Sequence, residues 1–461
     1  MKGIGITGID GASVDEAQES TLSKSFAASA SPQAAQAAHA TSATGTASAS
    51  ASQSSQPATT GLPAKGALAG VKVLELGTLI AGPFAARMLG EFGAEVIKIE
   101  DPAHGDPLRK WRKLHPDAGG TSLWWAVQAR NKKSVTINLK SPEGQEIVRK
   151  LAAQADIVVE NFRPGLLERF GLGYEQLSAE NPGLVMVRLS GYGQTGPYRD
   201  RPGFGAIAES MGGLRHITGY PDLPPPRIGI SIGDSIAALH GVIGAMMALH
   251  HRNVNGGRGQ VVDVALYEAV FNLMESVVPE YGVAGMVRER TGASLPGIVP
   301  SNTYPCADGM IVVGGNSDPI FKRLMHAIGR ADLAEDPGLA HNDGRVPRTQ
   351  EIDDAIGGWT RVRPIDEALA VLQGADVPAS RIYTVADMFQ DPQFAARQMI
   401  QRFKFPDGTP IDLPNITPKL SETPGETQWL GPELGAHTDE VLGQLGYDAE
   451  QIKRLRENKI I

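Results

Sequence analysis

Residues 71–100 read VKVLELGTLIAGPFAARMLGEFGAEVIKIE and decide the fold. Val71–Gly77 has the apolar character of a buried strand. Pro83–Phe92 carries apolar residues at helical spacing and starts with a proline, which suits a first helical turn. Glu95–Glu100 is a second short apolar strand. A strand, a helix and a strand in this order predict one βαβ unit of a parallel sheet.

The same alternation continues along the chain. Strands are predicted at 134–139, 156–160 and 184–190, and a helix from Ser141 to Ala155. Short apolar strands that alternate with amphipathic helices indicate a parallel sheet covered on both faces. We therefore predict a large Rossmann-like, doubly wound α/β lobe, of which residues 67–290 form the first part. Its ligands should bind at the carboxyl ends of the strands.

Two further regions follow this lobe. Residues 291–388 are predicted to form a smaller α+β lobe, with a strand at 310–315 and helices at 319–329 and 364–373. Residues 389–461 contain a predicted helix at 438–446 and a last helix capped by Asp448. The pattern alone does not say whether this C-terminal stretch rejoins the first lobe.

The N-terminal 66 residues have a different composition. Residues 25–60 contain no Asp, Glu, Lys or Arg and consist almost wholly of small and polar residues. Such a stretch cannot bury enough apolar surface to offset its ordering entropy. It also lacks the basic start and compact apolar block of a secretory signal. We predict a disordered Ala/Ser-rich extension.

Bulk composition excludes several classes of protein. The 461 residues carry 43 Lys plus Arg against 51 Asp plus Glu, a net charge of −8, so the basic excess of a nucleic-acid-binding protein is missing. We expect no run of about 18 apolar residues and hence no membrane span. The single cysteine, Cys306, fits a reducing compartment. A cytoplasmic enzyme is the expected class.

A nicotinamide dehydrogenase is the obvious alternative for the first lobe. Gly77, Gly82 and the acid at Glu100 imitate a dinucleotide-binding unit. The spacing G-x-G-x-x-G is absent, however, and Leu79 and Ile80 put bulk where a pyrophosphate needs close backbone approach. This alternative is disfavoured.

Few residues suggest metal or thiol chemistry. Cys306 has no obvious base nearby in sequence, and a small buried apolar role accounts for it. His250 and His251 are adjacent, so on a helix they point about 100° apart and do not converge on one ion. We predict no metal site and place this pair at the exposed end of a helix.

Asp234 is the most informative candidate. We predict a short strand at Arg227–Gly233, followed by a helix from Ser235 to His251 that carries an apolar stripe. Asp234 at their junction has two interpretations: a helix N-cap, or an ionised carboxylate beside a glycine turn that attacks an activated acyl group. Spacing alone leaves both open.

Eight stretches in register resemble the class III coenzyme A transferases, the family of formyl-CoA transferase and carnitine CoA-transferase. They are GTLIAGP at 77–83, NKKS at 131–134, KSPEG at 140–144, DIVVENFRPG at 156–165, GYGQTGPY at 191–198, IGDS at 232–235, GRGQ at 257–260 and HTDE at 437–440. The resemblance runs from about Leu68 to Ile461. It implies a large lobe built from both chain ends, an inserted smaller lobe and an interlocked homodimer.

The resemblance also implies the chemistry. Asp234 matches the family's catalytic aspartate, which forms anhydride and thioester intermediates with a CoA thioester substrate and needs no cofactor. Positions that resemble family residues lining the CoA are Ala81, Leu139, Lys140, Asn161, Phe162 and Arg169. Asp101 and Asn138 depart from the formyl-CoA transferase pattern, so the phosphate contacts must differ in detail. A non-catalytic CoA-binding protein stays as a further alternative.

Residues 201–215 bear on the choice of reaction and substrate. The related α-methylacyl-CoA racemases carry a histidine where this chain has Phe204, which disfavours racemisation, and the usual transferase acid one place on is Gly205. This stretch resembles the dicarboxylate-using branch, with succinyl-CoA as donor and malate, citramalate or a similar acid as acceptor. Arg201, Arg215, His216 and Arg227 would suit a second carboxylate.

Overall fold

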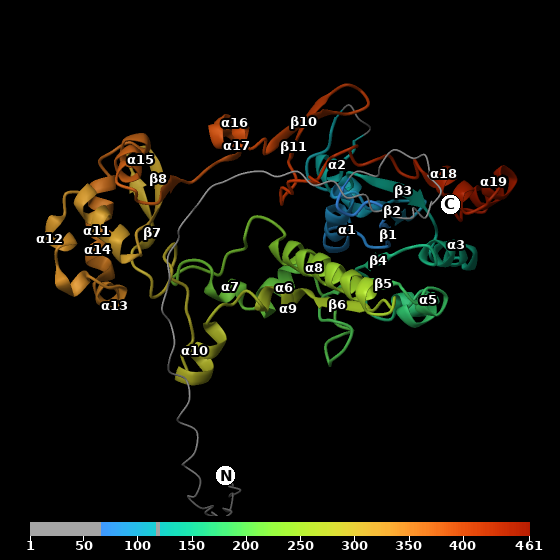
Figure 1. Ribbon diagram of the computed structural model, residues 1–461, viewed down its shortest axis with the longest axis horizontal. Helices are drawn as coiled ribbons and strands as arrows, with labels where there is room; N and C mark the ends of the chain where they lie inside the picture. The colour runs from blue at the N-terminus through green and yellow to red at the C-terminus, as the bar shows by residue number, and fades with distance from the viewer. Residues whose placement is uncertain (1–65, 117–119) are drawn as a thin grey trace, which may run out of the picture. The chain divides into compact units, whose positions relative to one another are not determined.

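The computed structural model describes residues 66–116 and 120–461. The prediction of an N-terminal extension therefore lies outside the described residues, apart from Gly66. The described chain contains one large parallel sheet, a three-stranded antiparallel sheet and a hairpin (Figure 1).

The large sheet has the strand order β3-β2-β1-β4-β5-β6, and every neighbouring pair is parallel. Its strands are β1 (Lys72–Glu75), β2 (Glu95–Glu100), β3 (Lys132–Thr136), β4 (Ile157–Glu160), β5 (Val185–Ser190) and β6 (Val261–Ala265). This order is that of a doubly wound dinucleotide-type sheet. The predicted Rossmann-like α/β fold is confirmed.

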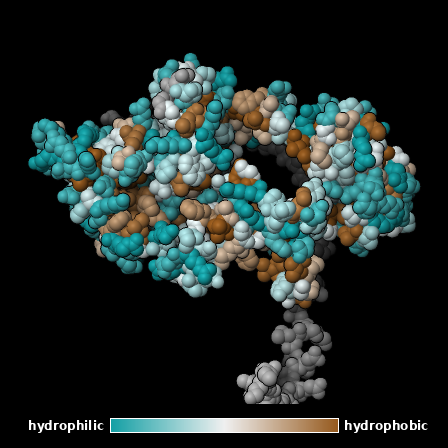
Figure 2. All heavy atoms as spheres, turned by 180° about the vertical axis from the view of Figure 1, so that it is seen from behind, coloured by the Kyte–Doolittle hydropathy of each residue, from teal (hydrophilic) through white to brown (hydrophobic). Residues whose placement is uncertain are grey.

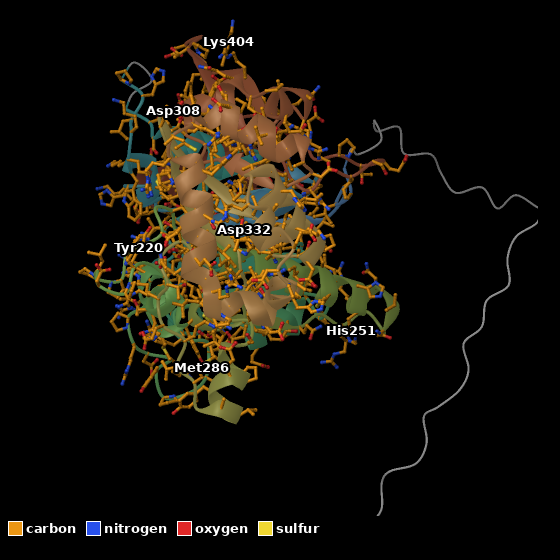
Figure 3. The ribbon with its side chains drawn as sticks, turned by 90° about the vertical axis from the view of Figure 1, so that its left-hand side faces the viewer. Tyr220, His251, Met286, Asp308, Asp332 and Lys404 are labelled. Atoms are coloured by element: carbon orange, nitrogen blue, oxygen red, sulfur yellow. The ribbon has the colours of Figure 1, made fainter. Side chains whose placement is uncertain are left out.

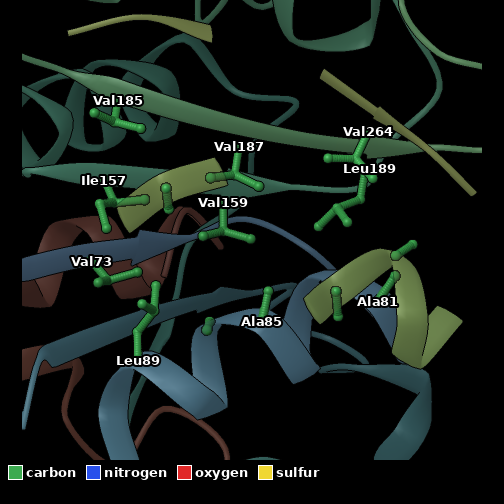
Figure 4. Packing of buried hydrophobic residues seen from close by; sticks show 14 of the residues in the cluster. Val73, Ala81, Ala85, Leu89, Ile157, Val159, Val185, Val187, Leu189 and Val264 are labelled. Atoms are coloured by element: carbon green, nitrogen blue, oxygen red, sulfur yellow. The ribbon is translucent and has the colours of Figure 1, made fainter. Parts of the chain in front are cut away.

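Alternate residues along the strands bury opposite faces of the sheet. On one face, Val73, Val159 and Val187 pack with residues of helices α1 (Ala81–Glu91) and α8 (Ile232–Val254) (Figure 4). On the other, Leu74, Val158 and Met186 pack with helices α3 (Pro142–Ala152), α5 (Tyr174–Glu180), α18 (Thr438–Gln444) and α19 (Ala449–Glu457). Because residues of α18 and α19 lie in this second core, the C-terminal stretch does contact the large sheet.

The helices of the large lobe lie between its strands and after β6 in the chain. They are α1 (Ala81–Glu91), α2 (Leu123–Gln128), α3 (Pro142–Ala152), α4 (Leu166–Arg169), α5 (Tyr174–Glu180), α6 (Gly205–Met211), α7 (Leu214–Ile217), α8 (Ile232–Val254), α9 (Leu266–Phe271) and α10 (Val277–Ala284), with the 3₁₀ turn η1 at Pro107–Lys110. The predicted helix at 83–92 corresponds to α1, which starts two residues earlier.

The second sheet has a core of its own. Strands β7 (Ser301–Cys306), β8 (Gly309–Gly314) and β9 (Ala379–Arg381) pair antiparallel. They pack with α11 (Asp318–Ala327), α12 (Ala331–Ala334), α14 (Thr349–Thr360) and α15 (Ile365–Gly374); α13 (Asn342–Arg345), η2 (Pro337–Leu339) and η3 (Val346–Arg348) connect them. Cys306 is buried in this core, as its interpretation as a small apolar residue predicts.

The remaining elements lie after residue 384. They are α16 (Val385–Gln390), α17 (Pro392–Ala396), the hairpin β10 (Ile400–Lys404) and β11 (Pro410–Pro414), α18 (Thr438–Gln444) and α19 (Ala449–Glu457). The Asp448 side chain caps α19 by accepting the Gln451 N–H, and the Gln451 side-chain oxygen accepts the Asp448 N–H. The predicted cap is confirmed.

Helix α8 corrects three predictions. Residues 227–231 form no strand, and the helix begins at Ile232 rather than Ser235. Most of its buried residues are small, such as Ala237, Gly241 and Ala245, and Ile236 of the predicted apolar stripe is buried with them. Leu239 and Ile243, also in that stripe, are 40% and 51% exposed. Small residues allow the close approach to β5: a Cβ at Gly241 would come within 3.1 Å of Val187.

Helix α8 bears on the prediction of no membrane span, although Asp234, His240 and His250 interrupt its apolar residues and it contains no run of 18. Among the described helices, α8 is the one that is long and apolar enough to cross a membrane, judged by length and composition only. Its most apolar 18-residue window has a mean hydropathy of 1.5, and 44% of that window is buried in the protein. A core helix of a soluble protein passes the same test. At its C-terminal end His250 and His251 are exposed, as predicted, and His251 projects from the helix end (Figure 3).

A buried charge cluster lies beneath the turn after β1. Lys98 Nζ lies 2.8 Å from Glu75 Oε1 and 2.9 Å from Asp106 Oδ2, and Lys132 Nζ lies 2.7 Å from Glu75 Oε2. Burial alone would lower the pKa of Lys98, but the surrounding carboxylates more than offset it and raise the pKa. Asp106 also accepts the N–H of Leu79, which has a φ of 65°. This contact helps to hold a strained turn.

Candidate active site

A cavity of about 370 Å³ lies at the carboxyl ends of β1, β4 and β5. Its lining includes 78–81 after β1, 161–164 after β4 and Ser190–Gly191 after β5. From β1 the chain runs to β2 on one side, while β4 lies on the other, so the strand order reverses between them. Doubly wound sheets bind ligands at such a reversal. The cavity therefore lies at the edge of the sheet where the sequence predicted a ligand.

The turn after β1 is tied to the turn after β4 by Asn161. Its Oδ1 accepts the Thr78 N–H at 2.8 Å, and its Nδ2 donates to Thr78 O at 2.9 Å. A Cβ at Gly77 would come within 2.7 Å of Asn161 Oδ1. The absence of a side chain at Gly77 thus lets the two turns meet, and the Asn161 amide already has partners within the protein.

Asp234 lines the cavity from the third residue of α8. The N-cap is Ser231, and no side chain makes a capping hydrogen bond there. The interpretation of Asp234 as an N-cap is therefore wrong, because the helix begins two residues before it. The carboxylate is half-buried and faces the cavity instead.

Two glycines bring the starts of α6 and α8 together beside this carboxylate. A Cβ at Gly233 would come within 2.8 Å of Gly205 O. A Cβ at Gly205 would overlap Asp234 Oδ2 and lie 2.8 Å from Asp234 Cγ. The lack of an acid at position 205 thus has a steric reason in this chain: the Asp234 carboxylate occupies that space. Phe204, the residue before it, lines the cavity and is 67% exposed.

Glu209 is a buried acid behind Asp234. Its Oε2 accepts from Arg215 Nη2 at 3.3 Å, and its Oε1 lies 3.9 Å from Arg227 Nη2. Burial raises the pKa of Asp234 to about 6; the Glu209 carboxylate adds to the rise, and the Arg227 guanidinium counteracts it. Asp234 is therefore mostly ionised at neutral pH but more basic than an ordinary aspartate.

Comparison with known proteins decides the family. The profile of CoA-transferase family III matches residues 68–438. The chain belongs to CoA-transferase family III. It is 52% identical over 393 residues to the succinyl-CoA–D-citramalate CoA-transferase of Chloroflexus aurantiacus, covering 85% of this chain and 97% of the relative. It is 32% identical to the human succinyl-CoA:glutarate CoA-transferase, covering 84% and 88%. The family resemblance and the enzyme class predicted from sequence are confirmed: the protein is a CoA-transferase.

Solved structures of the family share the fold. A CAIB/BAIF family protein from Brucella suis superposes with a TM-score of 0.72 at 34% identity and covers 83% of this chain and 100% of its own. The β subunit of the succinyl-CoA–L-malate CoA-transferase of Chloroflexus aurantiacus is 42% identical, covering 87% of this chain and 99% of that subunit. The transferase reading thus replaces the dehydrogenase alternative.

Five of the six CoA residues predicted for this transferase line one or both of two cavities. Ala81 and Asn161 line the first. Leu139 and Lys140 line a second cavity of about 240 Å³ at the ends of β2 and β3, and Phe162 lines both. Arg169 is exposed at the end of α4, outside both linings. The departures Asp101 and Asn138 also line the second cavity. The CoA contacts of all these residues stay predictions.

Sequence reasoning missed several side chains of this transferase's first cavity. Arg112, Arg163 and Arg199 line it, as do Trp111 and Trp124. They come from loops and from a short helix whose approach to Asp234 no local pattern reveals. The sequence did contain one signal for these arginines: each lies in a loop that follows a predicted strand, at the end of the sheet where a ligand is expected. Within residues 66–116 and 120–461, no group of three or more His, Cys, Asp or Glu side chains could hold a metal ion.

Proposed function

We propose that this transferase moves CoA from succinyl-CoA to a small dicarboxylic acid, such as citramalate or malate, through covalent intermediates on Asp234. The observation that carries the proposal is the half-buried Asp234 carboxylate in the cavity at the strand-order reversal. The names of relatives that use succinyl-CoA with citramalate, malate or glutarate support the choice of substrates.

The first half of the reaction proceeds in two exchanges. An Asp234 oxygen attacks the thioester carbonyl carbon, the C–S bond breaks, and CoA thiolate leaves as a mixed anhydride forms. The thiolate then attacks the aspartyl carbonyl carbon. The anhydride C–O bond breaks, succinate leaves as its carboxylate, and an aspartyl-CoA thioester remains.

The second half reverses these steps with the acceptor. The acceptor carboxylate attacks the aspartyl thioester and releases CoA thiolate, which then attacks the acceptor's carbonyl carbon in the new anhydride. The new thioester leaves, and Asp234 is again a carboxylate. Charge and atoms balance without a proton donor, so this chemistry needs no cofactor beyond the CoA thioester. The raised pKa of Asp234 makes its carboxylate a better nucleophile than an ordinary aspartate.

The two cavities suggest how CoA lies. Asp234 in the first cavity must meet the thioester, which places the pantetheine end there. The second cavity is lined by apolar side chains such as Ile137, Leu139 and Phe170, by the cation of Lys140 and by the carboxylates of Glu100, Asp101 and Asp106. Glu100 and Asp106 are paired with Arg109 and Lys98. The apolar side chains suit an adenine base, and Lys140 suits a phosphate. Phe162, which lines both, would lie between the two ends of CoA.

Racemisation is the second candidate reaction. It needs a second proton-carrying group opposite Asp234, and the related racemases use a histidine. The described lining of the first cavity contains no histidine, and Phe204 stands in its place. Transfer is therefore favoured over racemisation.

We also infer that the transferase is a homodimer in the cytoplasm. Large apolar side chains on α8 and α10 are uncovered by the described chain: Met247 is 67% exposed, Tyr281 62% and Val283 90%. Figure 2 shows apolar residues gathered over α10. Patches of this kind mark interfaces. Sedimentation velocity is expected to give the mass of two 48.8 kDa chains; a one-chain mass would contradict the inference.

The single cysteine supports the inferred location in the cytoplasm, which is a reducing compartment.

The function is tested by exchange of the acyl group. Purified enzyme is incubated with succinyl-CoA and each of several ¹³C-labelled acids, and the CoA thioesters are separated by mass. Citramalyl-CoA or malyl-CoA should accumulate as succinate is released in equal amount. Release of free CoA without a new thioester would indicate a hydrolase, and no change in succinyl-CoA with any acid would refute the proposed donor.

A further inference from the structure

Five arginines line the first cavity, and one of them is distinguished by its position. Arg201 lies 3.5 Å from the ring centre of Tyr198, Arg112 lies 4.8 Å from that of Trp124, and Arg199 pairs with Asp200 at 3.5 Å. Arg227 is the cation whose charge acts on Asp234. Arg227 Nη2 also lies 3.9 Å from Glu209 Oε1, and the Glu209 carboxylate likewise acts on Asp234, so Arg227 belongs to the end of the cavity that holds Asp234.

The anchor of Arg227 is buried Glu209. The Glu209 side chain is 1% exposed and is held by Arg215, whose Nε and Nη2 lie 3.4 Å and 3.3 Å from Oε2. The other oxygen, Oε1, has no hydrogen-bond partner among the described residues, and Arg227 Nη2 lies 3.9 Å from it. Glu209 thus attracts the guanidinium without satisfying its donors.

This pairing leaves Arg227 free to bind a ligand. A guanidinium has five N–H donors in a planar fork that fits a carboxylate. The Arg227 side chain is 50% exposed in the cavity, and an ion pair this long and exposed contributes little to stability. A fold-stabilising role therefore does not account for its placement beside the nucleophile.

We propose that Arg227 binds the carboxylate of the substrate that does not react, and so selects dicarboxylic acids over monocarboxylic acids of the same length. The proposal rests on the transferase function proposed above. While one end of succinate reacts at Asp234, its other end brings a further negative charge near Asp234 and Glu209. Without a cation the three carboxylates would repel one another. Arg227 lies where it can offset that repulsion through charge-assisted hydrogen bonds.

The test compares two acceptors that differ only at the far end. Succinate and butyrate both have four carbons, and butyrate has a methyl group in place of the second carboxylate. With succinyl-CoA as donor and ¹³C-labelled acceptors, kcat/KM is measured for both acids at pH 8, well above the wild-type Asp234 pKa of about 6. The wild-type enzyme should prefer succinate. Arg227→Gln should lower the succinate-to-butyrate ratio about 100-fold, as expected for the loss of a charge-assisted carboxylate contact, and Arg227→Lys should recover part of it.

The matched control is Arg199→Gln, which removes another cation of the same cavity that pairs with Asp200. It should leave the ratio unchanged. Equal losses for both acids in Arg227→Gln, or a wild-type enzyme that uses butyrate as well as succinate, would overturn the role of Arg227 while the transferase function stands. Absence of wild-type exchange with either acid would instead overturn the function on which the proposal rests.

Discussion

Replacement of Asp234 by alanine or asparagine is expected to lower the rate of CoA exchange by about 10⁴-fold or more, a loss typical of removing a covalent nucleophile. The physical reason is that neither side chain can supply the attacking oxygen for the anhydride. The measurement is exchange of ¹³C-labelled acid into succinyl-CoA. Quenching the wild-type enzyme with hydroxylamine during turnover should modify the peptide that contains Asp234, and the variants should show no such modification.

The loss should not arise from unfolding. Because the folded-state pKa of Asp234 is raised to about 6, ionisation of this carboxylate opposes folding once the pH exceeds the unfolded-state value. Asp234→Asn removes that unfavourable charge, so its thermal midpoint at pH 7 should equal or exceed the wild-type value. Ser235→Ala is the matched control, since Ser235 is the next residue and its Oγ donates only to Ser231 O at 3.0 Å in the described chain. It should retain most activity.

The pH profile gives a second readout of the same carboxylate. Attack requires the ionised form, so kcat/KM should fall as the pH falls through about 6. Glu209 raises the pKa of Asp234, so Glu209→Gln should move this midpoint to a lower pH. Full exchange by Asp234→Asn, or a wild-type profile that stays flat from pH 8 to pH 5, would rule out Asp234 as the nucleophile.

Much of the large lobe could be predicted because its strands follow simple rules. The strand from Glu95 to Glu100 was predicted with its exact bounds, and those at β1, β4 and β5 overlap the prediction closely. These strands are mostly buried, and each has a short apolar or alternating core, such as Ile157–Val159 in β4 or Val185–Val187 in β5, between polar loops. Strand β6 was missed, because Val261–Ala265 is a partly exposed edge strand interrupted by Asp263.

The segment before Asp234 shows why local patterns mislead. Ile228, Ile230 and Ile232 alternate with small or polar residues, which is the period of a half-buried strand. A strand needs a sheet edge, and beside β5 that place is taken by β6. Ile230 is therefore 58% exposed in a loop, and Ile232 begins a helix. The choice was decided by a segment thirty residues later, which alternation in a short window does not contain.

The candidate site also contains residues that the sequence could predict and contacts that it could not. Asp234 could be predicted as the nucleophile because its motif resembles that of the family. Its interpretation as an N-cap could be excluded only when the structure showed that the helix begins at Ile232. Asn161 was predicted as a CoA contact, and the structure adds that its amide bridges two turns. Arg227 was named for a second carboxylate from its charge, but its pairing with Glu209, which Arg215 also contacts from a separate helix, could not be predicted. Such three-dimensional pairings leave no periodic signal in the sequence.

Gly205 carries the second large expected effect. Gly205→Ala should lower kcat/KM for CoA exchange about 100-fold or more, a loss that a displacement of about 1 Å can produce in an enzyme site. The added Cβ would overlap Asp234 Oδ2 and lie 2.8 Å from Cγ. The carboxylate would have to rotate or the start of α6 would have to shift, and either change moves the attacking oxygen away from the thioester carbonyl.

The loss of activity in Gly205→Ala should come from displacement of the Asp234 carboxylate and not from a wider change in the protein. Gly443→Ala is the matched control, because Gly443 also lies in a helix but a Cβ there meets nothing within 4 Å. It should leave activity unchanged. CoA affinity, measured by calorimetry, should change little in Gly205→Ala, since the proposed binding mode places the other end of CoA at Lys140 and the second cavity. If Gly205→Ala exchanged acyl groups at the wild-type rate, the Asp234 carboxylate could not need the space beside Gly205, and the geometry on which the mechanism depends would be wrong.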